Sequence, residues 1–300
     1  MRKELKDYMK LGIVHFMAYP DESKRKETIK KVLCDEYFDV IEVTGILSEE
    51  TKKDLLSSRI TVCYGAQPVI MGLGLNVNSV DEDKRKESVE VLKNYIDEAY
   101  SINAVGFGFL SGHYEEENKE LAFQQLLVSS YELCEYAKLK GTMKIFHEVF
   151  DFDVDKCSLI GPSSLAAEYA EIVTSKYDNF GLMLDLSHIP LVRESIKDCI
   201  QTLRKYIGHI HIGNAVVADK SMDAYGDLHP RFGFPNSEND VEELIEFLDN
   251  LFQIGYFNEE EKRIVSFEVK PFKDEDPDII MSNNKRTLNQ AWAVLQKKGV

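Results

Sequence analysis

Short apolar segments rich in β-branched residues alternate with longer charged segments along the whole sequence of 300 residues. A strand needs only about five or six residues, whereas the helix that connects two parallel strands is longer, so this alternation predicts repeated strand–helix units. Such units place their strands parallel in one sheet, and the sequence is therefore expected to be of the α/β class. The segments that fit strands are residues 11–16, 39–43, 60–64, 103–109, 143–148, 180–185, 207–212 and 264–269.

The charged segments between the expected strands are typical of helices. Residues 81–100 begin with acidic side chains, and residues 238–256 contain Gly255 where a helix C-terminus often needs glycine. Eight strand–helix units close economically into a (β/α)8 TIM barrel, which uses roughly 250 residues plus insertions. We therefore predict one barrel domain over residues 1–300. A doubly wound open sheet is the alternative, but the GLGLN string from Gly72 lacks the third glycine of a dinucleotide-binding loop.

Composition excludes several classes of protein. Hydrophobic residues make up 44% and charged residues 29%, so the chain can bury a large core. The formal net charge of −16 repels phosphate backbones and anionic lipid surfaces, so we expect neither nucleic acid nor a membrane as a partner. Five scattered cysteines form no CxxC pair, which argues against disulfides and predicts a cytoplasmic protein.

Each of the last four expected strands ends near a residue that can bind a metal ion. Because the active sites of TIM barrels lie at the C-terminal ends of the strands, these residues are expected to meet. Oxygen and nitrogen ligands favour one hard or borderline divalent ion, with Mn²⁺ as the first choice and Mg²⁺ or Co²⁺ as alternatives. The other interpretation is that each residue only pairs with a neighbour. The candidate metal ligands are Glu148, Asp185, His211 and Glu268.

The strings around these residues resemble a known family. FHEVFD from Phe146, LDLSHIP from Leu184, HIHIGNA from His209 and FEVKP from Phe267 are similar to the sugar isomerase and epimerase branch of the xylose-isomerase-like barrels. The resemblance covers about residues 10–297. It implies that the four candidate ligands hold the metal, that one or both glutamates move a proton, and that His188 contacts substrate or metal. The arginine that ketose epimerases use for substrate does not appear in its usual place after the seventh strand.

Two loop segments carry a closer resemblance. YGDLHPRFG from Tyr225 and GAQPVIMGLGLNVNSVDE from Gly65 resemble the large subunit of bacterial C-glycoside deglycosidases. Those enzymes cleave the carbon–carbon bond between a 3-oxo sugar and an aromatic aglycone and work with a smaller second subunit. The resemblance implies a sugar or C-glycoside substrate, a small β subunit and an oligomeric protein.

His147 is open to two interpretations. Neighbouring residues on a strand point to opposite faces, so His147 turns away from the barrel mouth if Glu148 faces it, and the ring is then packed among other side chains. At the end of a strand the pleat can give way to a loop, and an imidazole beside a metal-bound carbonyl is a natural general base. We predict that His147 acts in catalysis together with Glu148 and Glu268.

A loop after the seventh expected strand holds further candidates. His229 and Arg231 lie among the turn residues Gly226, Pro230 and Gly233, and they can be solvated loop charges or can reach over the barrel mouth toward substrate hydroxyls. We take the second interpretation. The predicted substrate-binding residues are His188, Asn214, His229 and Arg231.

These features lead to ranked hypotheses for the function. The first is a metal-dependent lyase that cleaves a 3-oxo-C-glycoside, and the second is a ketose isomerase or epimerase. Both begin when a base takes a proton from the carbon next to a metal-polarised carbonyl. A third is a non-catalytic sugar-binding barrel. A metal-dependent endonuclease is a fourth, but it is expected to need a basic groove and more histidine ligands.

Overall fold

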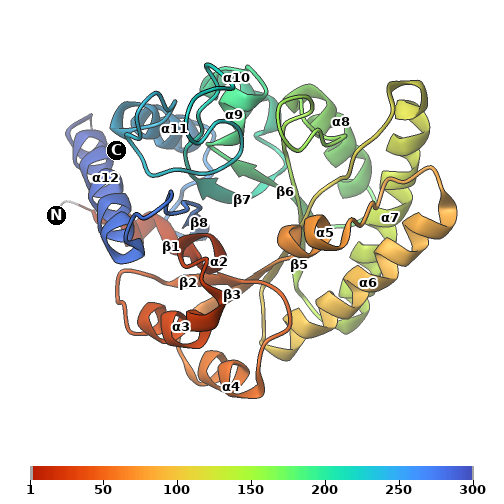
Figure 1. Ribbon diagram of the computed structural model, residues 1–300, viewed down its shortest axis with the longest axis horizontal. Helices are drawn as coiled ribbons and strands as arrows, with labels where there is room; N and C mark the ends of the chain where they lie inside the picture. The colour runs from red at the N-terminus through yellow and green to blue at the C-terminus, as the bar shows by residue number, and fades with distance from the viewer. Residues whose placement is uncertain (1–2, 299–300) are drawn as a thin grey trace. The chain divides into compact units, whose positions relative to one another are not determined.

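The computed structural model describes residues 3–298, and its eight parallel strands form a closed barrel in chain order. This confirms the predicted (β/α)8 fold. Figure 1 labels most of the strands and helices. The strands are β1 Met9–Val14, β2 Val40–Val43, β3 Thr61–Gly65, β4 Gly106–Phe109, β5 Lys144–Glu148, β6 Phe180–Asp185, β7 Ile207–Ile212 and β8 Arg263–Phe267.

All eight strands lie where the sequence predicts them, but only two have the predicted bounds, and the other six differ by one to three residues at one or both ends. Residues 180–185 and 207–212 form strands as predicted, whereas β4 starts at Gly106, three residues later than expected. The preceding residues end a helix and turn at Asn103, whose φ of 55° is left-handed and incompatible with a strand. β8 ends at Phe267, so Glu268 follows the strand directly.

Helices connect the strands. Two helix ends lie where their caps predict: the Asp81 side chain accepts hydrogen bonds from the first turn of α6, and Gly255, with φ of 74°, follows α11. The helices are α1 Leu5–Tyr8, α2 His15–Ala18, α3 Arg25–Leu33, α4 Glu49–Ser57, α5 Gln67–Leu73, α6 Glu82–Ser101, α7 Lys119–Lys140, α8 Ser163–Thr174, α9 His188–Leu191, α10 Ile196–Leu203, α11 Val241–Gln253 and α12 Pro277–Lys298; short 3-10 turns lie at Glu22–Lys24 and Glu116–Asn118.

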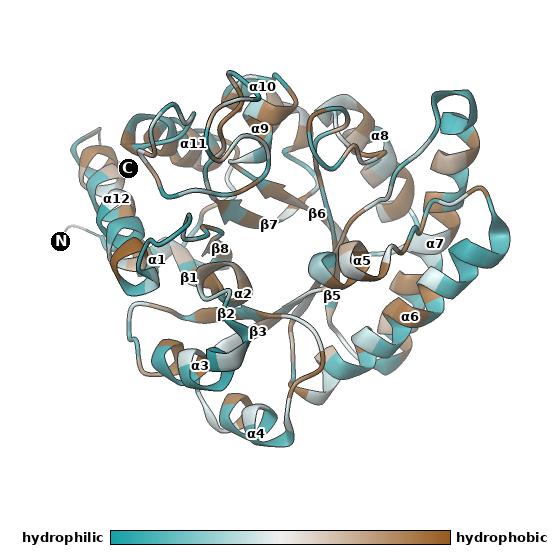
Figure 2. Ribbon diagram, in the orientation of Figure 1, coloured by the Kyte–Doolittle hydropathy of each residue, from teal (hydrophilic) through white to brown (hydrophobic). Residues whose placement is uncertain are grey.

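The contacts between residues divide the chain into two units. The first unit is residues 41–183, and the second is residues 1–40 together with residues 184–300. A single domain over residues 1–300 stays a prediction. In the first unit α6 packs beside α7 (Figure 1). Val89, Leu92 and Ile96 form a buried stripe on α6 at helical spacing. Figure 2 shows hydrophilic and hydrophobic residues mixed along both helices, because each also has an exposed face.

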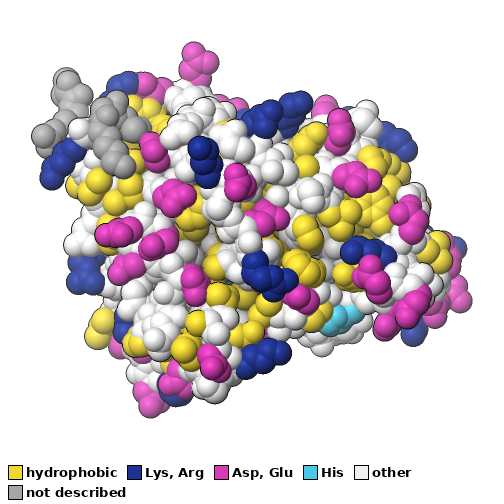
Figure 3. All heavy atoms as spheres, turned by 90° about the horizontal axis from the view of Figure 1, so that it is seen from above, with side chains coloured by type: hydrophobic (Ala, Val, Ile, Leu, Met, Phe, Trp, Pro, Cys, Tyr) yellow, Lys and Arg dark blue, Asp and Glu magenta, His cyan; other side chains and the backbone are white. Residues whose placement is uncertain are grey.

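In the second unit α11 packs against α10 and α12. Leu244, Phe247, Leu248 and Leu251 bury one face of α11, which explains why this segment folds as an amphipathic helix. The face drawn in Figure 3 carries acidic and basic side chains interspersed with each other. None of the helices within residues 3–298 combines the length and the apolar character that crossing a membrane requires.

Candidate metal centre

Three of the predicted metal ligands come together in the second unit. Asp185 ends β6, His211 is the penultimate residue of β7, and Glu268 follows β8. The backbone N–H of Leu186 donates to the His211 carbonyl at 3.1 Å, and that of Glu268 donates to the Ile212 carbonyl at 3.0 Å, so the strand ends are fixed side by side. Asp185, His211 and Glu268 each offer a ligand atom, and these atoms lie within 4.8 Å of one another.

The arrangement fits a divalent cation. Asp185 and His211 are buried, the Glu268 side chain is nearly so, and Oδ2 of Asp185 accepts no hydrogen bond from any residue of the described range 3–298. Burial raises the pKa of Asp185, whereas Glu268, where burial also acts to raise the pKa, is brought to about 2 by His211 and His229. A buried carboxylate oxygen without a partner is unfavourable, and a cation relieves this cost.

Gly213 allows the close packing of this centre. A Cβ atom at residue 213 would lie 2.6 Å from the Glu268 carbonyl oxygen, 3.0 Å from Nδ1 of His229 and 3.4 Å from Oδ1 of Asp185. The first distance is far shorter than van der Waals contact and involves a backbone atom that cannot rotate away. Glycine is therefore required at this position.

A buried array of two imidazoles and one carboxylate lies beside the centre. Oδ1 of Asp227 lies 2.7 Å from Nε2 of His229 and 3.0 Å from Nε2 of His188. Nδ1 of His229 lies 3.1 Å from the Glu268 backbone carbonyl, so the array is joined to a candidate ligand. His188 and His229 were predicted near the site, but Asp227 was missed. The sequence feature that could have indicated Asp227 is its position two residues before His229 in the same loop.

The pKa values of His229 and Asp227 in this array are shifted by the charged groups around them. Burial alone would lower the pKa of His229, but the negative charges of Asp227, Glu268 and Asp185 raise it to about 9. Burial also acts to raise the pKa of Asp227, which His229 and His188 hold well below its usual range. Asp185, His188 and His229 also offer ligand atoms within 4.8 Å of one another. With its pKa at about 9, His229 carries a proton at neutral pH, and its two ring N–H groups can donate to Asp227 Oδ1 and to the Glu268 carbonyl.

The structure does not support substrate contacts by Asn214 or Arg231. The Asn214 side chain donates to the Arg231 carbonyl and to Ser237 Oγ, each at 2.8 Å, and accepts from the N–H groups of Ala215 and Asn239 at 2.9 and 2.8 Å. These four bonds use its whole hydrogen-bonding capacity. The Arg231 guanidinium is paired with Glu275 at 2.9 Å. Both residues hold the loop in place.

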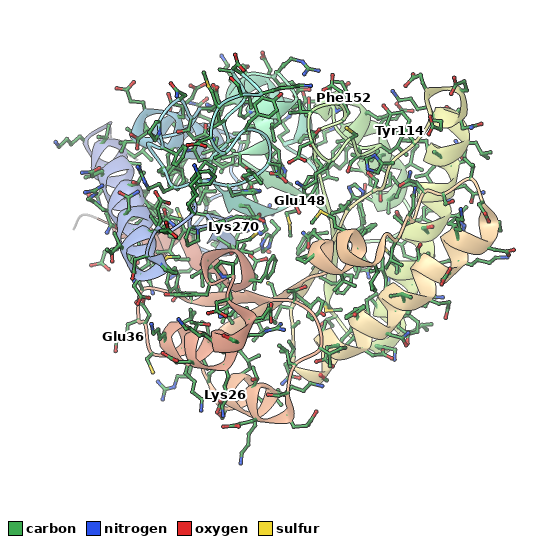
Figure 4. The ribbon with its side chains drawn as sticks, in the orientation of Figure 1. Lys26, Glu36, Tyr114, Glu148, Phe152 and Lys270 are labelled. Carbon is green, nitrogen blue, oxygen red and sulfur yellow. The ribbon has the colours of Figure 1, made fainter. Side chains whose placement is uncertain are left out.

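Glu148 lies in the first unit, at the end of β5, where Figure 4 labels it. It is buried, and Nε2 of Gln67 donates to its Oε2 at 2.6 Å. In the parallel pairing of β5 with β6, Glu148 stands opposite Met183, two residues before Asp185. Gln67, the first residue of α5, was not predicted, because only the fold brings it to a carboxylate 81 residues away.

His147 lies on the other face of β5 from Glu148. Its ring is fully buried between Phe109 and Tyr169 of α8, with both ring centroids 4.9 Å away, and neither nitrogen has a hydrogen-bond partner within residues 3–298. Burial lowers its pKa to about 3. The expectation that the pleat breaks down at this residue is wrong, since β5 stays regular through Glu148. The geometry favours packing over catalysis.

The comparisons with known proteins agree with this geometry. The family model described as xylose isomerase-like TIM barrel matches residues 13–278. The chain belongs to this family. No curated protein matches the xylose isomerase-like chain described here.

Solved structures similar to this xylose isomerase-like barrel include several sugar epimerases. A D-tagatose 3-epimerase-like protein is 18% identical, with a TM-score of 0.73, and the match covers 97% of this chain and 100% of the other. An IOLI protein with a bound zinc atom is 18% identical, with a TM-score of 0.72 and coverages of 94% and 98%. A 3-keto-D-glucoside 4-epimerase from E. coli is 14% identical, with a TM-score of 0.64 and coverages of 95% and 99%. At these identities the similarity establishes the fold.

Proposed function

We propose that this chain is a divalent-metal-dependent enzyme that moves a proton on a sugar carbon next to a carbonyl, as an epimerase or isomerase does. The observation that carries the proposal is the buried set Asp185, His211 and Glu268 at the ends of three consecutive barrel strands. Active sites of TIM barrels lie at these strand ends. The sugar class is supported by the epimerases among the similar solved structures.

Asp185, His211 and Glu268 would hold the metal, and we propose Glu148 as the fourth ligand. Its support is a buried carboxylate at the end of β5, the strand paired in parallel with β6, which ends at Asp185. A bound divalent ion would polarise the sugar carbonyl and make the neighbouring C–H more acidic. Mn²⁺ is our first choice, with Mg²⁺ and Co²⁺ next, although zinc is the ion in the solved IOLI protein.

In this proposal Glu148 and Glu268 transfer the proton. One carboxylate of the pair Glu148 and Glu268 takes the proton from the carbon, and the other returns a proton to the opposite face of the same carbon in an epimerase. An isomerase returns it to the neighbouring carbon instead. Gln67 orients the Glu148 carboxylate through its hydrogen bond. In this proposal His188, which Asp227 holds, contacts the substrate. Both nitrogens of His229 already bond protein groups, Asp227 and the Glu268 carbonyl, so His229 orients these two residues.

A second candidate is the lyase that cleaves a 3-oxo-C-glycoside. In this reaction a proton leaves the carbon next to the carbonyl, the bond to the aglycone carbon breaks, and that carbon keeps the electron pair and takes up a proton. The reaction needs an acid besides the glutamates. The buried array of His188, Asp227 and His229 favours this candidate, because it offers such an acid without His147. The smaller second subunit belongs to this candidate alone.

The experiment incubates the protein with Mn²⁺ in D₂O, with common ketoses and with 3-oxo-glucosides that carry O-linked or C-linked aglycones. Deuterium in the sugar, absent from Asp185→Asn and Glu268→Gln, supports the proposal. Release of the C-linked aglycone by the chain alone selects the lyase and shows that no second subunit is needed. Full metal content in both variants, or no deuterium in any sugar with metal-loaded wild type, would overturn the proposed function.

A further inference from the structure

Helix α7 carries apolar side chains on its outward face as well as on its inward face. It packs against β5, α6 and α8, and its inward face buries Phe123 and Leu133 (Figure 1). Its outward face exposes Leu121, Val128 and Leu139, which are 48%, 42% and 77% exposed. A surface helix is normally polar on its solvent side, and a helix that is apolar all round is normally covered on both sides. We therefore expect a further surface to cover the outward face of α7.

The three exposed side chains lie on one line along the helix. Leu121 and Leu139 are eighteen residues apart, and eighteen residues make five full turns of about 3.6 residues each. Val128 follows Leu121 by seven residues, which is almost two turns. The outward face therefore has an apolar line with a leucine near each end of the helix and a valine between them.

One charge of each sign lies beside the apolar line. Glu120 and Lys138 are also eighteen residues apart, so they take equivalent positions next to the two leucines, on the same side of the line. Glu120 is exposed. The Lys138 ammonium lies 2.8 Å from the Asp178 carboxylate, but both side chains are more than half exposed. Surface pairs of this kind are weak, so Lys138 can also pair with another carboxylate.

The charges of α7 balance, in contrast to those of the chain. Three basic and three acidic residues give the helix no net charge, whereas the whole chain carries −16. Two copies of such an acidic chain repel each other, and a neutral, partly apolar helix is the kind of surface on which this repulsion is weakest. The charged residues of α7 are Lys119, Glu120, Glu132, Glu135, Lys138 and Lys140.

We propose that two copies of this chain associate through their α7 helices, which pair in antiparallel order around a twofold axis. This pairing brings Leu121 of one copy to Leu139 of the other at both ends of the contact, and it brings Glu120 to Lys138 at the same two ends. The Val128 side chains lie near the axis. Parallel pairing would instead place Glu120 beside Glu120 and Lys138 beside Lys138, and like charges repel. The inference is independent of the proposed function, because no residue of α7 belongs to the candidate metal centre.

The first test measures the mass of the purified protein by sedimentation velocity, at about 1 to 100 µM, where a moderately stable dimer forms. We expect a mass near twice the 34.4 kDa of the chain. Leu121→Glu should raise the dimer Kd by about 100-fold, because the change acts twice in a symmetric contact and removes an apolar contact each time. Leu56→Glu is the matched control, since Leu56 of α4 is also 48% exposed but lies on another helix. Circular dichroism checks that both variants are folded.

The second test examines the order in which the helices pair. Lys138→Glu should weaken the dimer, because it brings two carboxylates together at both ends, and the additional change Glu120→Lys should restore it. In the wild type, a carbodiimide that joins a carboxylate directly to an amine should link Glu120 to Lys138. Within one chain these two residues are about 27 Å apart along the helix, so this link forms only between copies.

A dimer that Leu121→Glu dissociates, that Leu56→Glu leaves intact and in which Glu120 is linked to Lys138 supports the inference. A protein that stays monomeric over the whole concentration range would overturn it and would leave the outward face of α7 to a different protein. A dimer that both leucine variants weaken equally, or that neither weakens, would place the contact elsewhere and would overturn it as well.

Discussion

Gly213 shows how one residue controls the spacing of the candidate ligands. It lies between His211 and the buried array, and it leaves room for the Glu268 carbonyl and the His229 ring at distances that no other residue permits. His229 itself has a φ of 49°, so the backbone on both sides of the centre is unusually constrained. A small backbone shift at Gly213 therefore displaces the candidate metal ligands together with the neighbouring His229 ring.

Gly213→Ala is therefore expected to weaken metal binding by about 10- to 100-fold, the range seen when groups that orient ligands are changed. The readout is a metal titration of the purified variant. Gly72→Ala is the control, because a Cβ at this helical position meets nothing within 4 Å. Equal metal affinity in Gly213→Ala and wild type would contradict the argument.

A second residue-scale prediction concerns His147. Because the ring packs between Phe109 and Tyr169, His147→Phe should keep turnover within several-fold, whereas loss of a general base costs about 10² to 10⁴. The free energy of unfolding should not fall, since two buried nitrogens without partners are removed. Steady-state kinetics and denaturant unfolding measure both. A hundredfold loss of turnover at unchanged stability would restore the catalytic role.

His15 gives the protein a pH dependence that does not involve a bound metal ion. The ring is buried, one nitrogen lies 2.8 Å from Thr28 Oγ1, and burial together with Arg25 lowers its pKa from 6.5 to about 4. Between these two pH values the unfolded chain binds a proton at His15 that the folded chain does not. Stability is therefore complete above pH 6.5 and falls on acidification.

Each pH unit in this window should cost up to about 1.4 kcal/mol of the free energy of unfolding. Urea unfolding of wild type and His15→Gln at pH 7, 6 and 5 tests this, because glutamine can still bond Thr28 but does not titrate. Parallel pH curves for the two proteins would rule out His15 as a source of acid sensitivity.

At the scale of elements, the loop between β7 and α11 is organised by Asn214. Its four hydrogen bonds tie residues 215, 231, 237 and 239 to the end of β7, and the same loop carries Asp227 and His229. The loop is thus an ordered element that is held together by its own buried hydrogen bonds. Its position relative to the candidate ligands depends on a side chain that has no free group for a substrate.

Asn214→Ala should lower the free energy of unfolding by about 2–4 kcal/mol, because it leaves buried backbone groups without partners. It should also open the loop to proteases between residues 215 and 240. Limited proteolysis followed by mass spectrometry locates the cuts. Cuts that appear elsewhere, with this loop still protected, would show that Asn214 does not fasten it.

The sequence was informative about elements that obey local rules. The strands follow hydrophobic runs, and α6 and α11 follow their caps, so both were predictable. The meeting of the three candidate ligands at the ends of β6 to β8 was predictable because parallel strands end at one edge of a barrel. The roles of Asp227, Gln67 and Asn214 were not, since hydrogen bonds between residues far apart in the sequence decide them, and a motif does not show which way a loop side chain points.

At the scale of the whole molecule, the residues proposed for the chemistry lie at the strand ends, whereas the stability of the barrel comes from the packing of its apolar core. The core of apolar side chains extends over strands and helices throughout the described residues, and the candidate metal ligands are a small part of what is buried. The net charge of −16 adds no attraction for phosphate backbones. These features make a neutral sugar a better match than a nucleic acid.

Removal of the ion should consequently abolish activity and leave the fold intact. A chelator is expected to lower the free energy of unfolding by about 2.7 kcal/mol when the starting ion concentration is 100 times its Kd. Circular dichroism before and after chelation should superimpose, and added Mn²⁺ should restore turnover. Loss of the helical signal on chelation would mean that the ion is part of the folded structure.

The buried carboxylate of Asp151 accepts hydrogen bonds from the backbone N–H groups of Val154, Asp155 and Lys156, and this has a consequence for how the loop after β5 can change over time. Because this one buried side chain sets the backbone path of residues 151–158, the outward side chains of that segment are free to vary without loss of the loop. Descendants of this protein can exchange Lys156 or its neighbours and so change what this loop contacts, while the barrel and the residues of the candidate site stay unchanged. The same property makes the segment a practical target for libraries in directed evolution.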